Sequence, residues 1–278
     1  MPVIAMTQEM GSLAKDVAME LAASMNLAVM RHEVVDHVAG KMHVSTSLIN
    51  RLREGKAGLI ERVTTDTDRV ALYTAEEVFA LANQGNVVLR GWGATCLLRP
   101  VPHVVTVRIT RSFRKRVEWL MNHLETDDRD FAESEIRRSD HAHASRMHQQ
   151  FGVTWGDPVL YDLVLNTDRL SVPSCVELIH QLTTRPEFQE SEASRQLLAN
   201  MTLVARVRAA LKSHEPTQEV NITIEAQGGR VVLSGIVLHA REQAEVEKVA
   251  AQVNGVTQVE SRLRLMSPTR TFTYSKTT

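Results

Sequence analysis

The chain has 278 residues, 43% of them apolar, and a formal net charge of −1, which is the composition of an ordinary globular protein. A near-neutral charge gives no electrostatic reason to bind nucleic acid, and only three tryptophans, three tyrosines and six phenylalanines are available for base stacking. Without a secretory leader or an apolar stretch of ~20 residues, we expect a soluble, cytoplasmic protein whose Cys96 and Cys175 are reduced, buried thiols.

The N-terminal residues predict a strand, a sharp turn and an amphipathic helix. Residues 2–6 (PVIAM) form an apolar run, residues 11–12 mark a turn, and apolar side chains then recur at every fourth position from Leu13. In α/β proteins this order aims the unpaired amide groups of a helix N-terminus at a phosphate. The sequence therefore has the layout of a phosphate-binding loop.

The glycines of such a loop are missing. A standard loop has a glycine before its lysine and a hydroxyl after it, whereas Ala14 and Asp16 flank Lys15 here. Glu9 stands where the first glycine belongs. The motif therefore fails as a pattern even though its layout is kept.

Strands and helices alternate along the rest of the first 185 residues. Residues 87–89, 104–109 and 163–165 predict strands. Helices are expected at the other periodic segments, which are 33–39, 45–66, 74–81 with a capping box of Thr74 and Glu77, 113–124 and 173–182. This alternation predicts a parallel sheet with helices on both faces.

Residues 126–150 differ from the rest because they hold many charges and very few apolar side chains. A helix this polar cannot lie in a core. We expect it to be a solvated arm that acts as a cover.

The pattern changes after a polar linker that we place at 186–193. A helix around 197–211, alternating strands at 220–225 and 231–237, a helix at 246–253 and a strand at 259–265 predict a small α+β module. The expected domains are 1–185, a second module at 194–268 and a flexible tail at 269–278.

The first domain resembles the cytidylate kinase-like family, whose members are related to nucleoside monophosphate kinases and carry a P-loop fold. The resemblance covers roughly residues 3–183. It rests on the order and spacing of four segments, which are 4–18 (IAMTQEMGSLAKDVA), 90–94 (RGWGA), 151–158 (FGVTWGDP) and 161–167 (YDLVLNT). It implies an α/β fold of P-loop kinase type with a polar lid-like arm.

The resemblance also implies a nucleotide site that uses ATP and Mg²⁺. The cradle for the donor phosphates maps to Gly11, Ser12, Leu13, Ala14, Lys15 and Asp16. Two glycines of the family loop are replaced by Leu13 and Ala14, whose Cβ atoms restrict the approach of a phosphate, while Lys15 keeps a cation at the place of the family arginine.

Catalytic and binding roles on the arm and on the helix before it follow from the same resemblance. Arg116 matches the family arginine before a valine, and Arg114 lies beside it; the alternative is that both are charges on a solvated helix face. Arg137, Arg138 and Asp140 fall on the arm that would close over the phosphates.

Other positions depart from the family pattern. His143 stands where the family has an arginine three residues after the aspartate, and a neutral histidine lacks the fixed fork of a guanidinium. Arg31 replaces an aspartate on the acceptor side, and Trp92 replaces an arginine between two glycines. Asp168, after the last strand, could reach the nucleotide or simply start a helix.

A metal site is not expected. His141, His143 and His148 lie two and five residues apart, which does not put them on one helical face, and no cysteine is near.

Residues 194–266 resemble the BON module, which is linked to protein or phospholipid contacts. The resemblance rests on residues 229–237 (GRVVLSGIV) and 254–265 (NGVTQVESRLRL). Because Arg262 and Arg264 lie beside Glu260 and no polybasic cluster is present, a protein partner or a homo-oligomer is favoured over lipid.

Two functions stay open. The first is a nucleotide-binding protein that transfers phosphate from ATP to CMP or dCMP. The second is a catalytically impaired nucleotide sensor or scaffold that associates with its partner, or with itself, through the BON module.

Overall fold

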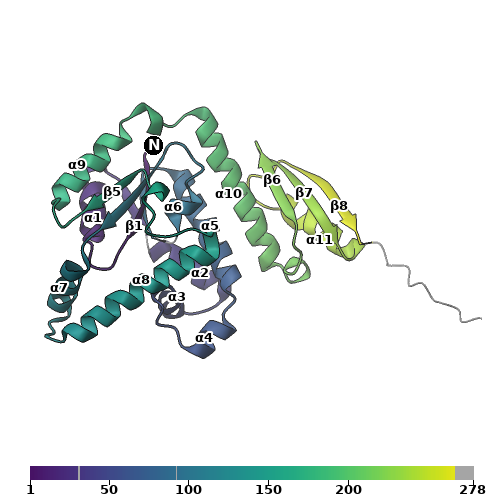
Figure 1. The fold of residues 1–278 in the computed structure, drawn as a ribbon. Helices are drawn as coiled ribbons and strands as arrows, with labels where there is room; N and C mark the ends of the chain where they lie inside the picture. The colour runs from purple at the N-terminus through teal and green to yellow at the C-terminus, as the bar shows by residue number, and fades with distance from the viewer. Residues whose placement is uncertain (31, 92, 267–278) are drawn as a thin grey trace, which may run out of the picture. The chain divides into compact units, whose positions relative to one another are not determined.

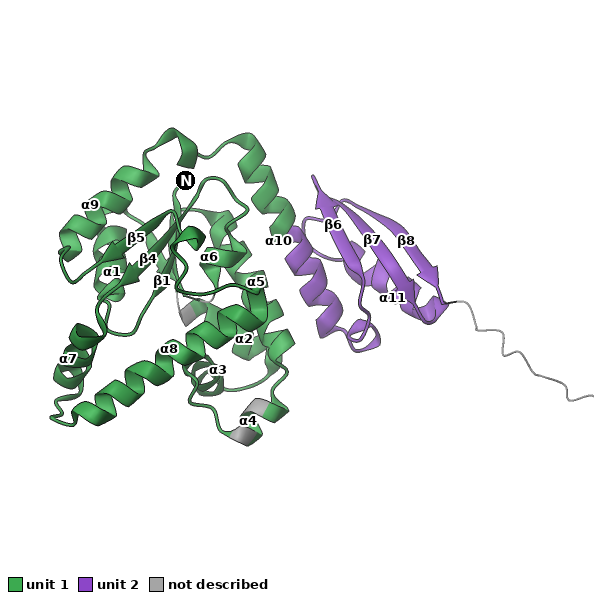
Figure 2. Cartoon of the chain, viewed as in Figure 1, with its two compact units in different colours: residues 1–202 green, residues 203–278 purple. Residues whose placement is uncertain are grey.

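The computed structural model describes residues 1–30, 32–91 and 93–266. Arg31, Trp92 and the tail expected at 269–278 lie outside these residues. Figure 1 shows the fold of the described part, and Figure 2 shows that it divides into two compact units, Met1–Thr202 and Leu203–Thr278.

This division lies inside helix α10 (Glu192–Ser213) rather than in a linker ahead of it. The first part of α10 is fixed to the first unit by buried polar contacts: Ser194 Oγ lies 2.8 Å from His103 Nδ1, and Thr202 Oγ1 donates a hydrogen bond of 3.2 Å to the Phe79 carbonyl. The segment that we expected to start the second module therefore belongs to the first unit.

The first unit is built on a five-stranded parallel sheet in the order β2-β3-β1-β4-β5. Its strands are β1 (Val3–Gln8), β2 (Ala28–Met30), β3 (Val87–Arg90), β4 (Val104–Thr110) and β5 (Leu163–Asn166). This is the parallel sheet with flanking helices that the alternating pattern predicted.

Both faces of the sheet are covered, as β1 shows. Ile4 and Met6 lie in a core cluster with the inner face of helix α1, whereas Val3 and Ala5, which point to the other face, are buried too. The helices of the first unit are α1 (Ala14–Met25), α2 (His32–Met42), α3 (Thr46–Glu54), α4 (Leu59–Thr64), α5 (Thr67–Gln84), α6 (Ala94–Leu97), α7 (Phe113–Leu124), α8 (Arg129–Phe151) and α9 (Val172–Thr183).

The predicted capping box of Thr74 and Glu77 is wrong. Helix α5 starts two turns earlier, because the Asp66 side chain accepts hydrogen bonds of 3.0 Å from the amides of Asp68 and Arg69. Thr74 is instead a buried residue in the middle of the helix.

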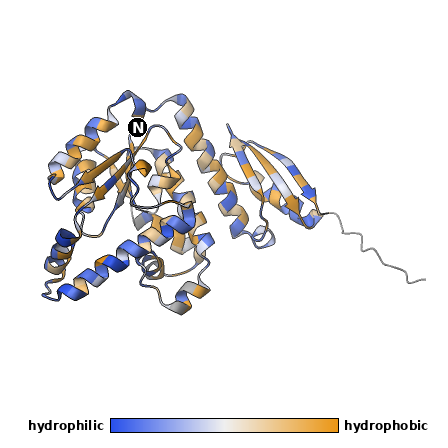
Figure 3. Ribbon diagram, in the orientation of Figure 1, coloured by the Kyte–Doolittle hydropathy of each residue, from blue (hydrophilic) through white to orange (hydrophobic). Residues whose placement is uncertain are grey.

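Helix α8 is the long polar arm expected at 126–150, and Figure 3 shows it mostly in hydrophilic colours. It is not wholly solvated, because one face carries Ala132, Ile136, Ser139 and Met147, all of them buried. Ala132 and Ile136 form a small core cluster with Val117 and Leu120 of α7. The arm therefore packs on α7 at its N-terminal end.

The second unit is a three-stranded sheet, in the order β6-β7-β8, with the end of α10 and helix α11 (Ala240–Ala251) packed on it. Its strands are β6 (Thr223–Gln227), β7 (Arg230–Val237) and β8 (Gln258–Leu265). β6 pairs antiparallel with β7, and β7 pairs parallel with β8. β6 starts at Thr223 rather than at residue 220.

None of the helices within the described ranges is long and apolar enough to span a membrane. Short 3₁₀ turns complete the chain and are η1 (Pro158–Leu160), η2 (Pro186–Phe188) and η3 (Glu215–Thr217).

Candidate functional site

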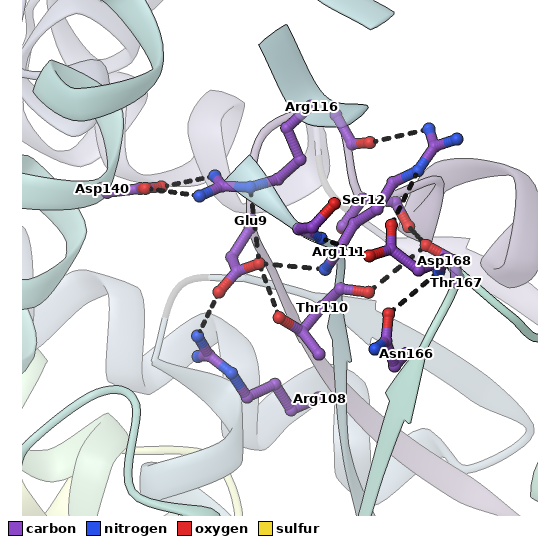
Figure 4. A network of polar contacts seen from close by, with 12 residues as sticks. Glu9, Ser12, Arg108, Thr110, Arg111, Arg116, Asp140, Asn166, Thr167 and Asp168 are labelled. Carbon is purple, nitrogen blue, oxygen red and sulfur yellow. Dashed lines mark hydrogen bonds and ion pairs between the residues drawn. The ribbon is translucent and has the colours of Figure 1, made fainter. Parts of the chain in front are cut away.

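Polar residues that follow β1, β4 and β5 meet at one edge of the first unit's sheet. The carboxyl ends of parallel strands share an edge, and ligands of open α/β sheets bind there. Glu9 follows β1, Thr110 is the last residue of β4 and is followed by Arg111, and Thr167 and Asp168 follow β5. Figure 4 shows their side chains in one connected network.

The turn between β1 and α1 is held tightly by its surroundings. Gly11 has φ +79°, and a Cβ there would come within 3.1 Å of Trp119 Cε3 and 3.2 Å of the Arg116 Cα on α7. The Ser12 carbonyl accepts a hydrogen bond of 2.9 Å from Thr167 Oγ1. The left-handed backbone and the close approach of α7 therefore both favour glycine at this position.

Leu13 adopts a backbone conformation that a leucine disfavours. It caps α1 with φ 63° and ψ 14°, in the left-handed region, and makes no side-chain capping bond. This conformation costs a residue with a Cβ about 1–2 kcal/mol. Leu13 therefore holds a backbone conformation that glycine adopts more readily.

Leu13→Gly is expected to raise the free energy of unfolding of the first unit by about 1 kcal/mol, because glycine adopts this φ without strain. Urea denaturation followed by tryptophan fluorescence measures the change. The matched control is Leu13→Ala, which shortens the side chain but keeps the Cβ. A gain in Leu13→Ala equal to that in Leu13→Gly would contradict strain as the cause.

Ala14 does not block the turn. Its side chain is buried and belongs to the core cluster beneath α1, together with Val17 and Leu21. The Ala14 methyl group therefore faces the sheet. Leu13, in contrast, is half-buried and lies nearer to the surface.

Lys15 and Asp16 are exposed in the first turn of α1. Within the part of the chain that the structure describes, Lys15 has no ion pair and no side-chain hydrogen bond. The Ser12 hydroxyl, three residues earlier, is buried and also lacks a partner among the described residues. One free cation and one unused hydroxyl thus flank the unpaired amides of the helix start.

Glu9 is the centre of the network in Figure 4. Its carboxylate lies 2.6 Å from Arg108 Nη2 and accepts hydrogen bonds of 2.7 Å from Thr110 Oγ1 and 3.2 Å from the Arg111 amide. Arg116 Nε lies 3.7 Å away. The Glu9 carboxylate is therefore already paired with Arg108 and Arg116 at the carboxyl end of the sheet.

Arg116 links this network to the arm. It donates two parallel hydrogen bonds, of 2.9 and 2.8 Å, to the carboxylate of Asp140 on α8. Burial lowers the pKa of Arg116, but the hydrogen bonds to Asp140 and the charges of Asp140 and Glu9 outweigh it and raise that pKa. The Arg116 guanidinium therefore stays positively charged, and the carboxylates of Asp140 and Glu9 balance its charge.

Asp168 faces the same turn from β5. Its carboxylate accepts a 3.3 Å hydrogen bond from the Ser112 amide and lies 3.8 Å from Arg111 Nε. Burial acts to raise the pKa of Asp168, but the hydrogen bonds from Ser112 and the charges of Lys115 and Arg111 outweigh burial and lower that pKa. Its main contacts are thus with the loop after β4.

The remaining arginines expected at the site lie away from this network. Arg114 is 68% exposed and pairs with Glu118 on its own helix. Arg137, also 68% exposed, lies 3.8 Å from Glu133 and over the Phe113 ring, and Arg138 pairs with Glu135 at 2.5 Å. The structure brings Arg116 and Asp140 together but gives these three cations partners along α8 or α7.

The His143 side chain packs between α8 and the segment that follows this helix. Its ring stacks on Trp155, with centroids 5.1 Å apart, and Nδ1 lies 3.0 Å from the Ser139 carbonyl. Burial, together with the charges of Arg146 and Arg53, lowers the pKa of His143 to about 4. His143 is therefore neutral near pH 7, and its ring packs on Trp155.

Arg146 of the arm caps another helix. Its guanidinium donates to the carbonyls of Leu52, at 3.3 Å, and of Arg53, at the C-terminal end of α3. This contact joins the C-terminal half of α8 to α3, as Arg116 joins its middle to α7. Among the described residues no group of three or more histidine, cysteine or acidic side chains could hold a metal ion.

Sequence reasoning missed Arg108 and Arg111 and did not recognise the role of Glu9. Their common signal is position, because Arg108 lies in the last three residues of β4, and Arg111 and Glu9 directly follow the ends of β4 and β1. The register of β1 on β4, with Gln8 opposite Ile109, then brings Glu9 next to Thr110.

The chain matches two families. Residues 3–169 match the cytidylate kinase-like family, and residues 201–266 match the BON domain. No curated protein gives a match.

Solved structures are similar to part of this chain at low sequence identity. An uncharacterized protein from Eubacterium ventriosum ATCC 27560 is 19% identical with a TM-score of 0.52, over 66% of this chain and 100% of that chain. Shikimate kinase from Bacteroides thetaiotaomicron is 18% identical with a TM-score of 0.40, over 65% of this chain and 97% of that chain.

Proposed function

We propose, from the premise that the chain belongs to the cytidylate kinase-like family, that its first unit binds a nucleotide through the phosphates at the turn between β1 and α1. The observation that carries this proposal is Lys15, an exposed cation without an ion pair among the described residues, in the first turn of α1. The helix dipole and the unpaired amides of the same turn also attract an anion.

The residues of the turn suit ATP with Mg²⁺. Lys15 and the amides of the first helical turn would hold the phosphates. Asp16 supplies a carboxylate oxygen where a standard loop has a hydroxyl, and oxygen is the ligand that Mg²⁺ prefers. When bound, Mg²⁺ would offset the negative charge of the phosphates.

We further propose that phosphate transfer to CMP or dCMP is slow or absent. Transfer of a phosphoryl group depends on cations placed around it. Here Arg108 is neutralised by Glu9, and Arg116 is neutralised by both Glu9 and Asp140. The favoured function is then a nucleotide sensor whose BON domain contacts a protein partner or a second copy, and the active kinase is the second candidate.

Removal of the Lys15 charge tests the binding proposal. We expect Lys15→Ala to weaken ATP binding by roughly ten- to a hundredfold, since a hydrogen bond to a charged group contributes about 1.5–3 kcal/mol. Titration calorimetry with ATP, ADP, CMP and CTP measures the affinity. The control is Lys248→Ala, which removes an exposed lysine of the second unit and should bind like the wild type.

A coupled phosphotransfer assay separates the two candidates. ATP binding without transfer to CMP or dCMP supports the sensor. Steady transfer overturns it in favour of the kinase, and failure of all four nucleotides to bind at millimolar concentration removes both.

A further inference from the structure

Strand β8 (Gln258–Leu265) forms an open edge of the second unit. Among the described strands of that unit, β7 lies on one side of β8 and no strand lies on the other. Such an edge presents a row of unpaired backbone N–H and C=O groups over eight residues, which is a template for another strand.

The two faces of β8 differ in chemistry. Val259 and Leu263 pack against the core of the unit, so the alternate residues Glu260 and Arg262 point to the other face. Glu260 accepts hydrogen bonds from Arg230 of β7 and, at 2.6 Å, from Arg262. The exposed face of the edge thus carries charges of both signs.

Self-pairing of this strand has one favoured register. An antiparallel pair related by a two-fold axis keeps the core faces of both copies on the same side only if it is centred on a residue. Centred on Glu260, the pair sets Glu260 opposite itself, and centred on Arg262, it sets Arg262 opposite itself although Glu260 then lies opposite Arg264. Centred on Ser261, it sets Glu260 opposite Arg262 twice and Val259 opposite Leu263 twice.

We propose that β8 pairs antiparallel with β8 of a second copy of this chain, centred on Ser261, to form a continuous six-stranded sheet. In this register Gln258 lies opposite Arg264 at both ends of the paired segment. The proposal rests on the part of the proposed function that gives the BON domain a second copy as its partner, and it does not depend on nucleotide binding.

The other open edge of the unit, β6, is less suited to self-pairing. It has five residues, and its one charged side chain is Glu225. No register of β6 on itself can therefore set opposite charges against each other. This difference assigns the self-association to β8.

A pair of edges alone buries little surface, so the dimer should form in a concentration-dependent manner. Sedimentation velocity of the full chain over a range of concentrations measures this. We expect wild type to shift from monomer to dimer, and Glu260→Arg and Arg262→Glu each to remain monomeric over the same range, because each sets like charges opposite each other.

The two charge variants also provide their own rescue. An equimolar mixture of Glu260→Arg and Arg262→Glu restores both opposite-charge pairs, and so does the double variant E260R/R262E with itself. We expect dimers in both cases, which a merely misfolded single variant would not give. Circular dichroism and melting curves check that each single variant is folded.

Several outcomes would overturn the proposal. They are a wild-type monomer at every concentration, single variants that dimerise like wild type, and a mixture that stays monomeric. A chain ending at Met266 should dimerise like the full chain. Loss of the dimer in that shortened chain would assign the contact to residues 267–278 instead.

Discussion

Glu9→Gln is expected to lower the free energy of unfolding of the first unit by about 3–5 kcal/mol. The Glu9 carboxylate is 12% exposed and faces Arg108, which is also buried, at 2.6 Å. Loss of one partner of a buried ion pair leaves the other charge uncompensated, which is costly by about this amount. The amide of glutamine keeps one acceptor but no charge.

Urea denaturation followed by tryptophan fluorescence measures this loss, because all three tryptophans lie in the first unit. The matched control is Glu118→Gln, which removes the exposed pair with Arg114 and should change the free energy by less than about 0.5 kcal/mol. Addition of Arg108→Met to Glu9→Gln should recover part of the loss. Equal losses of stability in Glu9→Gln and Glu118→Gln would show that the buried ion pair contributes no more than the exposed one.

A second large effect concerns pH. Because the pKa of His143 falls to about 4 in the folded protein, the unfolded chain binds a proton at this residue between its ordinary value near 6.5 and about 4, and the folded chain does not. The contribution of the neutral His143 to the free energy of unfolding is therefore fully present above pH 6.5 and is lost as the pH falls toward 4. The full loss is about 3 kcal/mol.

The measurement is the free energy of unfolding at several pH values across this window. His143→Gln removes the titrating ring, so the slope that it causes should vanish while the neutral side chain stays. His180→Gln, on the exposed face of α9, is the control and should keep the wild-type slope. An unchanged slope in His143→Gln would refute the assignment.

Much of the fold follows from local periodicity. The run at residues 2–6 predicts β1, and the apolar stripe at 113–124 coincides with α7. Errors arise where several signals compete. Thr74 has the chemistry of a cap, but Asp66 takes that role a few residues earlier, and α10 continues through the boundary expected before residue 194.

The candidate site is only partly visible in the sequence. Gly11 and Lys15 stand out because a turn and a helix start are local features. The partners of Glu9 depend on the pairing of β1 with β4, whose strands are about a hundred residues apart, and no local pattern encodes this. In the same way, His143 reads as a lost arginine until its stacking on Trp155 shows what it does.

Gly11 lies so close to α7 that even a methyl group at this position would meet Trp119 and Arg116. Arg116 in turn donates both of its parallel hydrogen bonds to Asp140 in the middle of α8. The turn, α7 and α8 therefore form one continuous path of contacts through the first unit.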